Sequence, residues 1–155
     1  MQKILAATVV TLALSAMTLP AVADPLDDAI TARRAYYQVV KFNAVPLIKM
    51  GGGKIPYDAK KAATFAANLK ALSEMTNSAM WPKGSDNVAK KGKTRALPKI
   101  WETYPAVTEK SKVFKQAIAE LVPVAGKGMA DFAGKAKALG AACGACHKEY
   151  RAKDL

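Results

Sequence analysis

Two cysteines and a histidine stand close together near the end of the chain, as Cys143, Cys146 and His147, in the order CxxCH. His147 is also the single histidine among the 155 residues. Two thiols three residues apart on a helix lie on nearly one face, where both can add to the vinyl groups along one edge of a porphyrin. The histidine that follows offers an imidazole to the iron. The pattern therefore predicts one covalent c-type haem, attached through Cys143 and Cys146 and ligated by His147.

Three other uses of these residues fit less well. A redox-active CxxC pair would stand at the start of a helix that follows a strand, and no strand is predicted before Cys143. A zinc site needs four ligands, whereas two cysteines and one histidine supply three. A pair of inert, buried cysteines would leave the neighbouring His147 unexplained. Because the chain has one histidine, a haem iron held by two histidines is excluded.

The N-terminus has the parts of a secretory signal peptide. Lys3 gives a basic start, residues 4–19 form a mainly apolar run, and Ala21-Val22-Ala23 is a small-residue cleavage site. The run is short for a membrane span, and no later stretch is apolar enough to cross a bilayer. We therefore expect residues 1–23 to be removed, the protein to be exported to the periplasm, and residues 24–155 to form a single domain with no membrane anchor.

The chain is strongly basic. It has 24 Lys and Arg against 12 Asp and Glu, a formal net charge of +12 at pH 7. The lysines are spread over every segment without a nucleic-acid-binding motif, which favours an ordinary solvated surface and no nucleic-acid partner. The same positive field would steer an acidic redox partner or a small anion toward the protein.

Four helical patterns and no strand pattern follow the expected cleavage site. The predicted helices cover about 25–49, a segment starting after an N-cap at Asp58, a segment starting near Pro105, and about 129–153. Apolar residues recur at spacings of three and four in each of them. In the first helix one stripe holds Ile30, Arg33, Tyr37, Val40, Ala44 and Leu47, and Pro46 is expected to loosen the last turn. In the last helix the row is Phe132, Ala136, Leu139, Cys143, Cys146 and Tyr150.

These patterns predict an all-α fold, an antiparallel up-down four-helix bundle, with the covalent haem in its core beside the last helix. The predicted row of the second helix is Ala62, Phe65, Leu69, Leu72 and Met75. Residues 77–98 are rich in turn-forming types and predict a long crossover loop. Trp81 and Trp101 stand near its ends and are expected to anchor it in the core, with Trp81 also a candidate contact of the haem.

The run from Cys143 to Arg151 resembles the CxxCHxxYR pattern of the cytochrome c′ family. Residues 55–59, Ile-Pro-Tyr-Asp-Ala, resemble the start of that family's second helix, and residues 98–101, Pro-Lys-Ile-Trp, resemble the start of its third. The resemblance covers the whole mature chain and implies a haem-bearing four-helix bundle. Ordinary small cytochromes c carry CxxCH near the N-terminus and are a poor match.

The resemblance also implies roles for residues of the first helix. It aligns Arg33 with an arginine near the haem propionates and Tyr37 with the residue over the iron. A shift of the alignment by one turn or one residue would bring Tyr36 or Val40 to that place instead. On spacing alone, Tyr37 is also an ordinary core residue.

The residue opposite His147 decides the coordination of the iron. Relatives with a methionine there are six-coordinate, low-spin electron carriers. Met50 lies about three turns beyond Tyr37, and Met75, Met80 and Met129 lie outside the first helix. We therefore expect a five-coordinate, high-spin iron.

Arg151 follows His147 by four residues and is expected beside the imidazole, where its charge would weaken the iron–histidine bond. The alternative is a solvated arginine at a helix C-terminus, where cations are favoured.

The resemblance implies a binding module for nitric oxide and carbon monoxide that also transfers electrons. The alternative is a six-coordinate, low-spin relative that acts only as a redox shuttle. An enzymatic role such as a peroxidase is not expected, because such chemistry needs a second acid or base and the lone His147 is used by the iron. The resemblance further implies a homodimer formed through the first two helices, with Tyr36 and Val39 on the exposed side.

Overall fold

The computed structural model describes residues 24–154; the expected signal peptide and Leu155 lie outside the described residues. The helices are α1 (Pro25–Gly51), α2 (Ala59–Glu74), α3 (Lys99–Glu102), α4 (Tyr104–Leu121) and α5 (Met129–Tyr150), with a short 3-10 helix, η1 (Ser78–Met80). The described residues contain no strand, only an isolated bridge between Ala96 and Arg151. The prediction of an all-α four-helix bundle is confirmed, since α1, α2, α4 and α5 are its four long helices.

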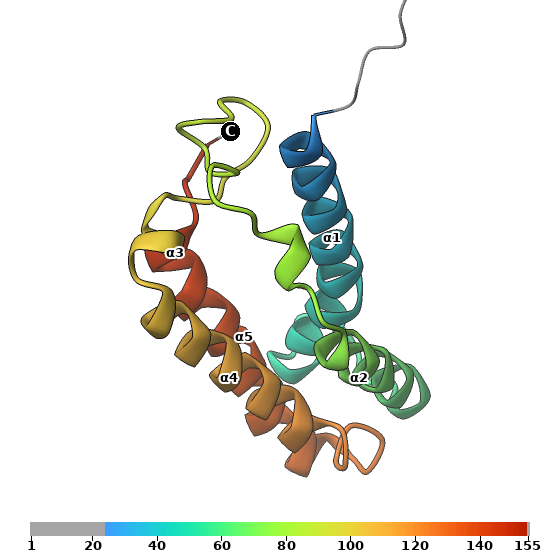
Figure 1. Ribbon diagram of the computed structural model, residues 1–155. Helices are drawn as coiled ribbons and strands as arrows, with labels where there is room; N and C mark the ends of the chain where they lie inside the picture. Colours follow the sequence, from blue (N-terminus) through green and yellow to red (C-terminus); the bar gives the residue numbers. More distant parts are fainter. Residues whose placement is uncertain (1–23, 155) are drawn as a thin grey trace, which may run out of the picture.

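The four long helices pack as two neighbouring pairs. α1 contacts α2 and α5, and α4 contacts α5 and α2. Figure 1 shows α4 descending and α5 returning beside it, while residues 75–98, the crossover segment, run from α2 up beside α1 and over the upper end of the bundle to α3. The crossover segment therefore links the α1/α2 pair to the α4/α5 pair. No helix among residues 24–154 combines the length and the apolar character needed to cross a membrane.

The main core is built from the predicted stripes. The largest fully buried apolar side chains are Leu47, Leu69, Ile118, Leu121, Phe132 and Leu139, which come from all four long helices. In α2 the prediction is wrong for Met75, which lies beyond the end of the helix and is exposed. Ala66 and Ser73 are buried on that face instead. Ala66 and Ser73 belong to the buried face because they follow the buried Ala62 and Leu69 by four residues each, about one helical turn.

In α1, Tyr36 is buried and Tyr37 is exposed, which is the reverse of what the sequence predicted. Tyr36 is 8% exposed and belongs to the main core, whereas Tyr37 is 42% exposed. The Tyr36 hydroxyl donates a hydrogen bond to the Leu72 carbonyl at 2.9 Å, which ties α1 to α2. A step of three residues from Arg33 keeps position 36 on the buried row. The expectation that Tyr36 lies on an exposed dimer face is therefore wrong.

The ends of the helices also differ from the sequence prediction in two places. α1 continues to Gly51, two residues beyond the predicted end, with Pro46 inside the helix. α5 ends at Tyr150 rather than near residue 153, because Arg151 is extended and pairs with Ala96. The predicted N-cap of α2 is confirmed, since the Asp58 side chain accepts a hydrogen bond from the Lys61 amide at 2.9 Å.

Candidate functional site

Cys143 and Cys146 lie one turn apart on α5, and both thiols are free and half-buried. Their row was expected to be fully buried. The neighbouring Phe132, Leu139 and Tyr150 are buried, whereas the two thiols are only half covered by protein. Burial, and next the neighbouring Cys146, raises the pKa of the Cys143 thiol. Both cysteines are therefore neutral thiols on one face of α5.

His147 follows on the last turn of α5 and is exposed. The surrounding protein lowers the pKa of its imidazole, and the cations of Arg151 and Arg95 lower it further. Arg151 itself is exposed and caps the helix, its amide donating to the His147 carbonyl at 3.2 Å. Two arginines thus favour a neutral imidazole, although the sequence indicated only one.

Tyr37 lies on α1 near the two thiols. Desolvation by the surrounding side chains raises the pKa of its phenol, the nearby Tyr36 and Cys146 raise it further, and the Arg33 cation opposes the shift. Its ring meets that of Tyr36 edge to face, with centroids 5.0 Å apart. Of the three residues considered for this position, Tyr36 has its hydroxyl bonded to α2 and Val40 is buried in the main core, so Tyr37 is the one that lies near the thiols.

Arg33 lies one turn before Tyr37 and is only 3% exposed. Its guanidinium carbon lies 4.4 Å from the centroid of the Trp81 ring. Four hydrogen bonds, all to the crossover segment, surround the same guanidinium; the acceptors are the Met80 carbonyl, the Ser85 hydroxyl, the Ser85 carbonyl and the Thr94 hydroxyl. The structure thus brings Arg33, Tyr37 and Trp81 together, with Arg33 directed to the crossover segment.

Trp81 and Trp101 do anchor the crossover segment, as predicted. Their ring centroids are 6.2 Å apart, and the Trp101 indole N–H donates to the Trp81 carbonyl at 3.0 Å. Both pack against a second, smaller core, which holds Ala96, Ile100 and Tyr150, with Cys146 and Val107 at its margin. This aromatic group therefore lies directly beside one of the two thiols.

Sequence reasoning missed the polar residues of the crossover segment. Ser85 and Thr94 are buried and accept from Arg33, although 52 and 61 residues separate them from it in the chain. Arg95 binds the chain just after α5. None of them belongs to a periodic pattern, so no signal in the sequence marks them.

The residues of this region fit a covalently attached haem. Two free thiols lie one turn apart on one helix face, an imidazole follows them, and Tyr37 and Trp81 supply aromatic surface nearby. Two thiols, one nitrogen ligand and a largely apolar surround are the donor set and environment of a c-type haem. A four-helix bundle whose last helix carries CxxCH defines a class, the helical-bundle c-type cytochromes.

Comparisons with known proteins agree with this class. A family model described as Cytochrome C' matches residues 28–151. Cytochrome c-554 of Cereibacter sphaeroides is 34% identical over 146 residues, which cover 92% of this chain and 95% of that protein. Cytochrome c' of the same organism is 31% identical over 153 residues, which cover 99% of each. The chain belongs to the cytochrome c′ family.

Solved structures extend the comparison. A cytochrome c' structure from Rhodobacter sphaeroides superposes with a TM-score of 0.80 at 32% identity, covering 84% of this chain and 99% of that one. A nitric oxide complex of a mutant cytochrome c prime from Alcaligenes xylosoxidans gives a TM-score of 0.69 at 27% identity, covering 86% and 99%. A carbon monoxide-bound variant from the same organism gives 0.70 at 26% identity, covering 84% and 98%.

Proposed function

We propose that this protein is a monohaem c-type cytochrome that binds nitric oxide and carbon monoxide at an open face of the haem and also transfers electrons. Cys143 and Cys146 attach the haem, and His147 is the protein ligand of the iron. When bound, the haem supplies a ferrous iron with one coordination position free for a small gaseous ligand. The observation that carries this proposal is the pair of free thiols one turn apart on α5, followed by His147, with the contacting rings of Tyr37 and Trp81 nearby.

The residues around the two thiols have different proposed roles. Tyr37 places an aromatic ring on the side opposite His147 and restricts entry to small ligands. Trp81 covers the neighbouring edge of the site and contacts Tyr37, with ring centroids 6.1 Å apart. Burial, Arg151 and Arg95 favour the neutral imidazole of His147 over the protonated one, and the neutral form is the one that can bind iron.

Solved relatives support the choice of gaseous ligands. Nitric oxide and carbon monoxide complexes are described for cytochromes c prime of the same fold. An apolar, aromatic surround gives little support to a polar bound dioxygen, so we expect discrimination against oxygen.

Addition of carbon monoxide to the reduced holoprotein tests the proposal. The expected result is a high-spin ferrous absorption spectrum that changes when the gas is added. A low-spin spectrum that the gas leaves unchanged would contradict the open face.

The second candidate is a six-coordinate redox shuttle, and Met80 is the specific reason to keep it. The sequence placed Met80 in a loop far from the first helix, but η1 packs against α1 and the Met80 carbonyl accepts from Arg33 at 3.1 Å. A thioether is a known axial ligand of c-type haem. Met80 is therefore the residue to substitute if the reduced spectrum is low-spin.

We further propose an exported homodimer. Phe42 on α1 is 70% exposed and meets Phe65 of α2 edge to face, with Val39 exposed on the same helix. Phe65 is half-buried, so Phe42 is the exposed ring of the pair, and an exposed ring that rests on a neighbouring helix is suited to burial against a second copy. A solved relative is described as a cytochrome c' with ligand-controlled dimer dissociation, with a TM-score of 0.73 at 25% identity, covering 86% of this chain and 100% of that one.

Export and partner choice complete the proposal. Cleavage after Ala23 would leave Asp24 first, and the Asp24 side chain caps α1 by accepting from the Leu26 amide at 2.9 Å. N-terminal sequencing of the periplasmic protein checks this. An acidic redox protein is the partner that the basic surface favours.

A further inference from the structure

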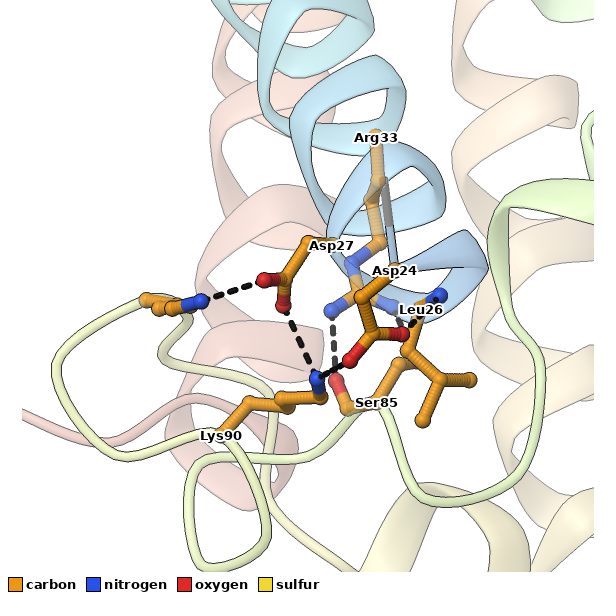
Figure 2. A network of polar contacts seen from close by, with 7 residues as sticks. Asp24, Leu26, Asp27, Arg33, Ser85 and Lys90 are labelled. Carbon is orange, nitrogen blue, oxygen red and sulfur yellow. Dashed lines mark hydrogen bonds and ion pairs between the residues drawn. The ribbon is translucent and has the colours of Figure 1, made fainter. Parts of the chain in front are cut away.

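The buried guanidinium of Arg33 holds the crossover segment on its α1 side. Nη1 donates to the Met80 carbonyl at 3.1 Å and to the Ser85 hydroxyl at 2.9 Å. Nη2 donates to the Ser85 carbonyl at 2.7 Å and to the Thr94 hydroxyl at 2.9 Å. Figure 2 shows Arg33 reaching from α1 toward Ser85. Four charge-assisted bonds, three of them buried, make this the strongest attachment of the segment to α1.

Ion pairs add a weaker attachment at the surface. Lys90 pairs with Asp24 and Asp27, and Lys93 pairs with Asp27 (Figure 2). Lys90 is 15% exposed, but Asp24 and Lys93 are open to solvent, so water and salt partly screen these pairs. Arg33, which is almost fully buried, therefore dominates the contact.

The next residues of the same segment hold the chain that follows His147. The Arg95 side chain donates through Nε to the Ala152 carbonyl at 2.7 Å, and the Ala152 amide donates to the Arg95 carbonyl at 2.8 Å. The Leu97 amide donates to the Tyr150 carbonyl at 3.0 Å. These bonds flank the bridge between Ala96 and Arg151. The segment thus clasps the end of α5 within a turn of His147.

Thr94 connects the two attachments. Its hydroxyl accepts from Arg33 at 2.9 Å and from the Ala96 amide at 3.2 Å. Thr94 is buried and immediately precedes Arg95. A single short stretch, residues 94–97, therefore touches both the helix of Tyr37 and the strand-like end of the helix of His147.

We propose that Arg33 is a positioning residue that joins the two faces of the haem site: it fixes the crossover segment, and the segment fixes the chain end beside His147. This inference rests on the proposed function. The resemblance places Arg33 near the haem propionates, and both terminal nitrogens of its guanidinium donate to the crossover segment. Its main role is then to transmit a displacement of α1 at Tyr37 to the iron ligand on the other side.

Hydrogen exchange on the reduced holoprotein tests the connection directly. Substitution Arg33→Lys keeps the positive charge but removes the two terminal nitrogens of the guanidinium. Thr94→Val removes the hydroxyl that accepts from both Arg33 and the Ala96 amide. We expect the Leu97 and Ala152 amides to exchange about tenfold faster in both variants. Arg34→Lys is the matched control, because Arg34 is an exposed neighbour with one bond to the Lys93 carbonyl. Thr94→Ser keeps the hydroxyl and should restore slow exchange.

The iron–histidine vibrational band of the reduced protein is the second readout. We expect it to shift in Arg33→Lys and Thr94→Val and to stay in place in the two controls. A purely structural role of Arg33 would lower the melting temperature but leave the band, and the Leu97 and Ala152 amides, as in the wild type. That result would overturn the inference. If Arg33→Lys fails to fold, the results for Thr94→Val test the inference alone. A low-spin spectrum of the wild type would reject the proposed function. The exchange rates of the Leu97 and Ala152 amides would still show whether Arg33 is coupled to the chain beside His147.

Discussion

The rings of Tyr37 and Trp81 meet edge to face, with centroids 6.1 Å apart and an interplanar angle of 78°. Tyr37 comes from α1 and Trp81 from the crossover segment, so two distant parts of the chain form one aromatic wall. Trp81 in turn contacts Trp101, which extends the wall to α3 and to the thiol of Cys146. The wall is the part of the site that a ligand opposite His147 would have to pass.

Replacement of Tyr37 by alanine should accelerate ligand binding. Removing the ring opens the proposed path to the iron, and we expect the carbon monoxide association rate to rise on the order of tenfold, which corresponds to about 1.4 kcal/mol of barrier. Flash photolysis measures this rate. Tyr37→Phe is the control: it keeps the ring and removes the hydroxyl, so its rate should stay near that of the wild type. An unchanged rate in Tyr37→Ala would show that the Tyr37 ring does not restrict access to the iron.

Replacement of Met80 by leucine should leave the reduced absorption spectrum unchanged. The expected five-coordinate iron has no methionine ligand, and leucine fills a similar volume. Met50→Leu, at a buried position near the end of α1, controls for general effects of such a change. If Met80→Leu converts a low-spin spectrum to a high-spin one, Met80 is the sixth ligand and the redox-shuttle alternative is correct.

Alanine at Gly51 should destabilise the bundle, and alanine at Gly134 should not. A Cβ at residue 51 would lie 2.5 Å from the Cβ of Ala136, where α1 crosses α5, whereas a Cβ at residue 134 meets nothing within 4 Å. We expect Gly51→Ala to lower the free energy of unfolding by about 1–3 kcal/mol. Gly134→Ala should raise it by up to about 1 kcal/mol, because glycine is a poor helix former. Denaturant titration of both variants measures whether each substitution lowers or raises the free energy of unfolding.

Acid should weaken the ion pairs that fasten the crossover segment. Hydrogen bonds from Lys93 and then Lys90 lower the pKa of Asp27. A lowered folded-state pKa means that the pair stabilises the fold above the ordinary aspartate pKa of about 3.9 and that this contribution is lost as the pH falls through the lower value.

Asp27→Asn tests this directly. Below about pH 4 the free energy of unfolding should fall less steeply in Asp27→Asn than in the wild type. Asp28→Asn is the control, because Asp28 has no ion pair among the described residues. Equal slopes for the wild type and Asp27→Asn would show that the pairs are irrelevant to folding.

Phe42→Asp should convert the proposed dimer into a monomer. A charge at a position that a second copy buries has no partner there and costs more than the lost apolar contact. Sedimentation velocity of the holoprotein reports the mass. Val113→Asp, which changes an equally apolar and exposed position on α4, should leave the dimer intact. A wild-type protein that is already monomeric would contradict the dimer proposal.

Much of the fold follows from local patterns in the sequence. The spacing of three and four residues predicted the long helices and most of the buried row of α5, because a helix repeats every 3.6 residues. Asp58 marked the start of α2, because a carboxylate there binds free amides of the first turn. The attachment motif was equally readable, since Cys143, Cys146 and His147 must stand on one helix to share a porphyrin edge.

Other features needed the tertiary structure. The sequence placed Tyr37 in the stripe of α1, but spacing leaves a choice between adjacent residues, and packing against Leu72 gives the core position to Tyr36. α5 ends at Tyr150 because Arg151 finds a partner in Ala96, which no local pattern indicates.

The chemistry of the site divides in the same way. The sequence by itself predicted the haem-attachment triad, Cys143, Cys146 and His147, and the helix that carries it, because those residues are neighbours in the chain. Only the tertiary structure decided what surrounds the triad: the contacts of Arg33 with Ser85 and Thr94, and those of Arg95 with Ala152, join residues more than 50 positions apart. Such contacts depend on how the crossover segment folds back over the bundle, and side-chain spacing along one helix carries no information about that path.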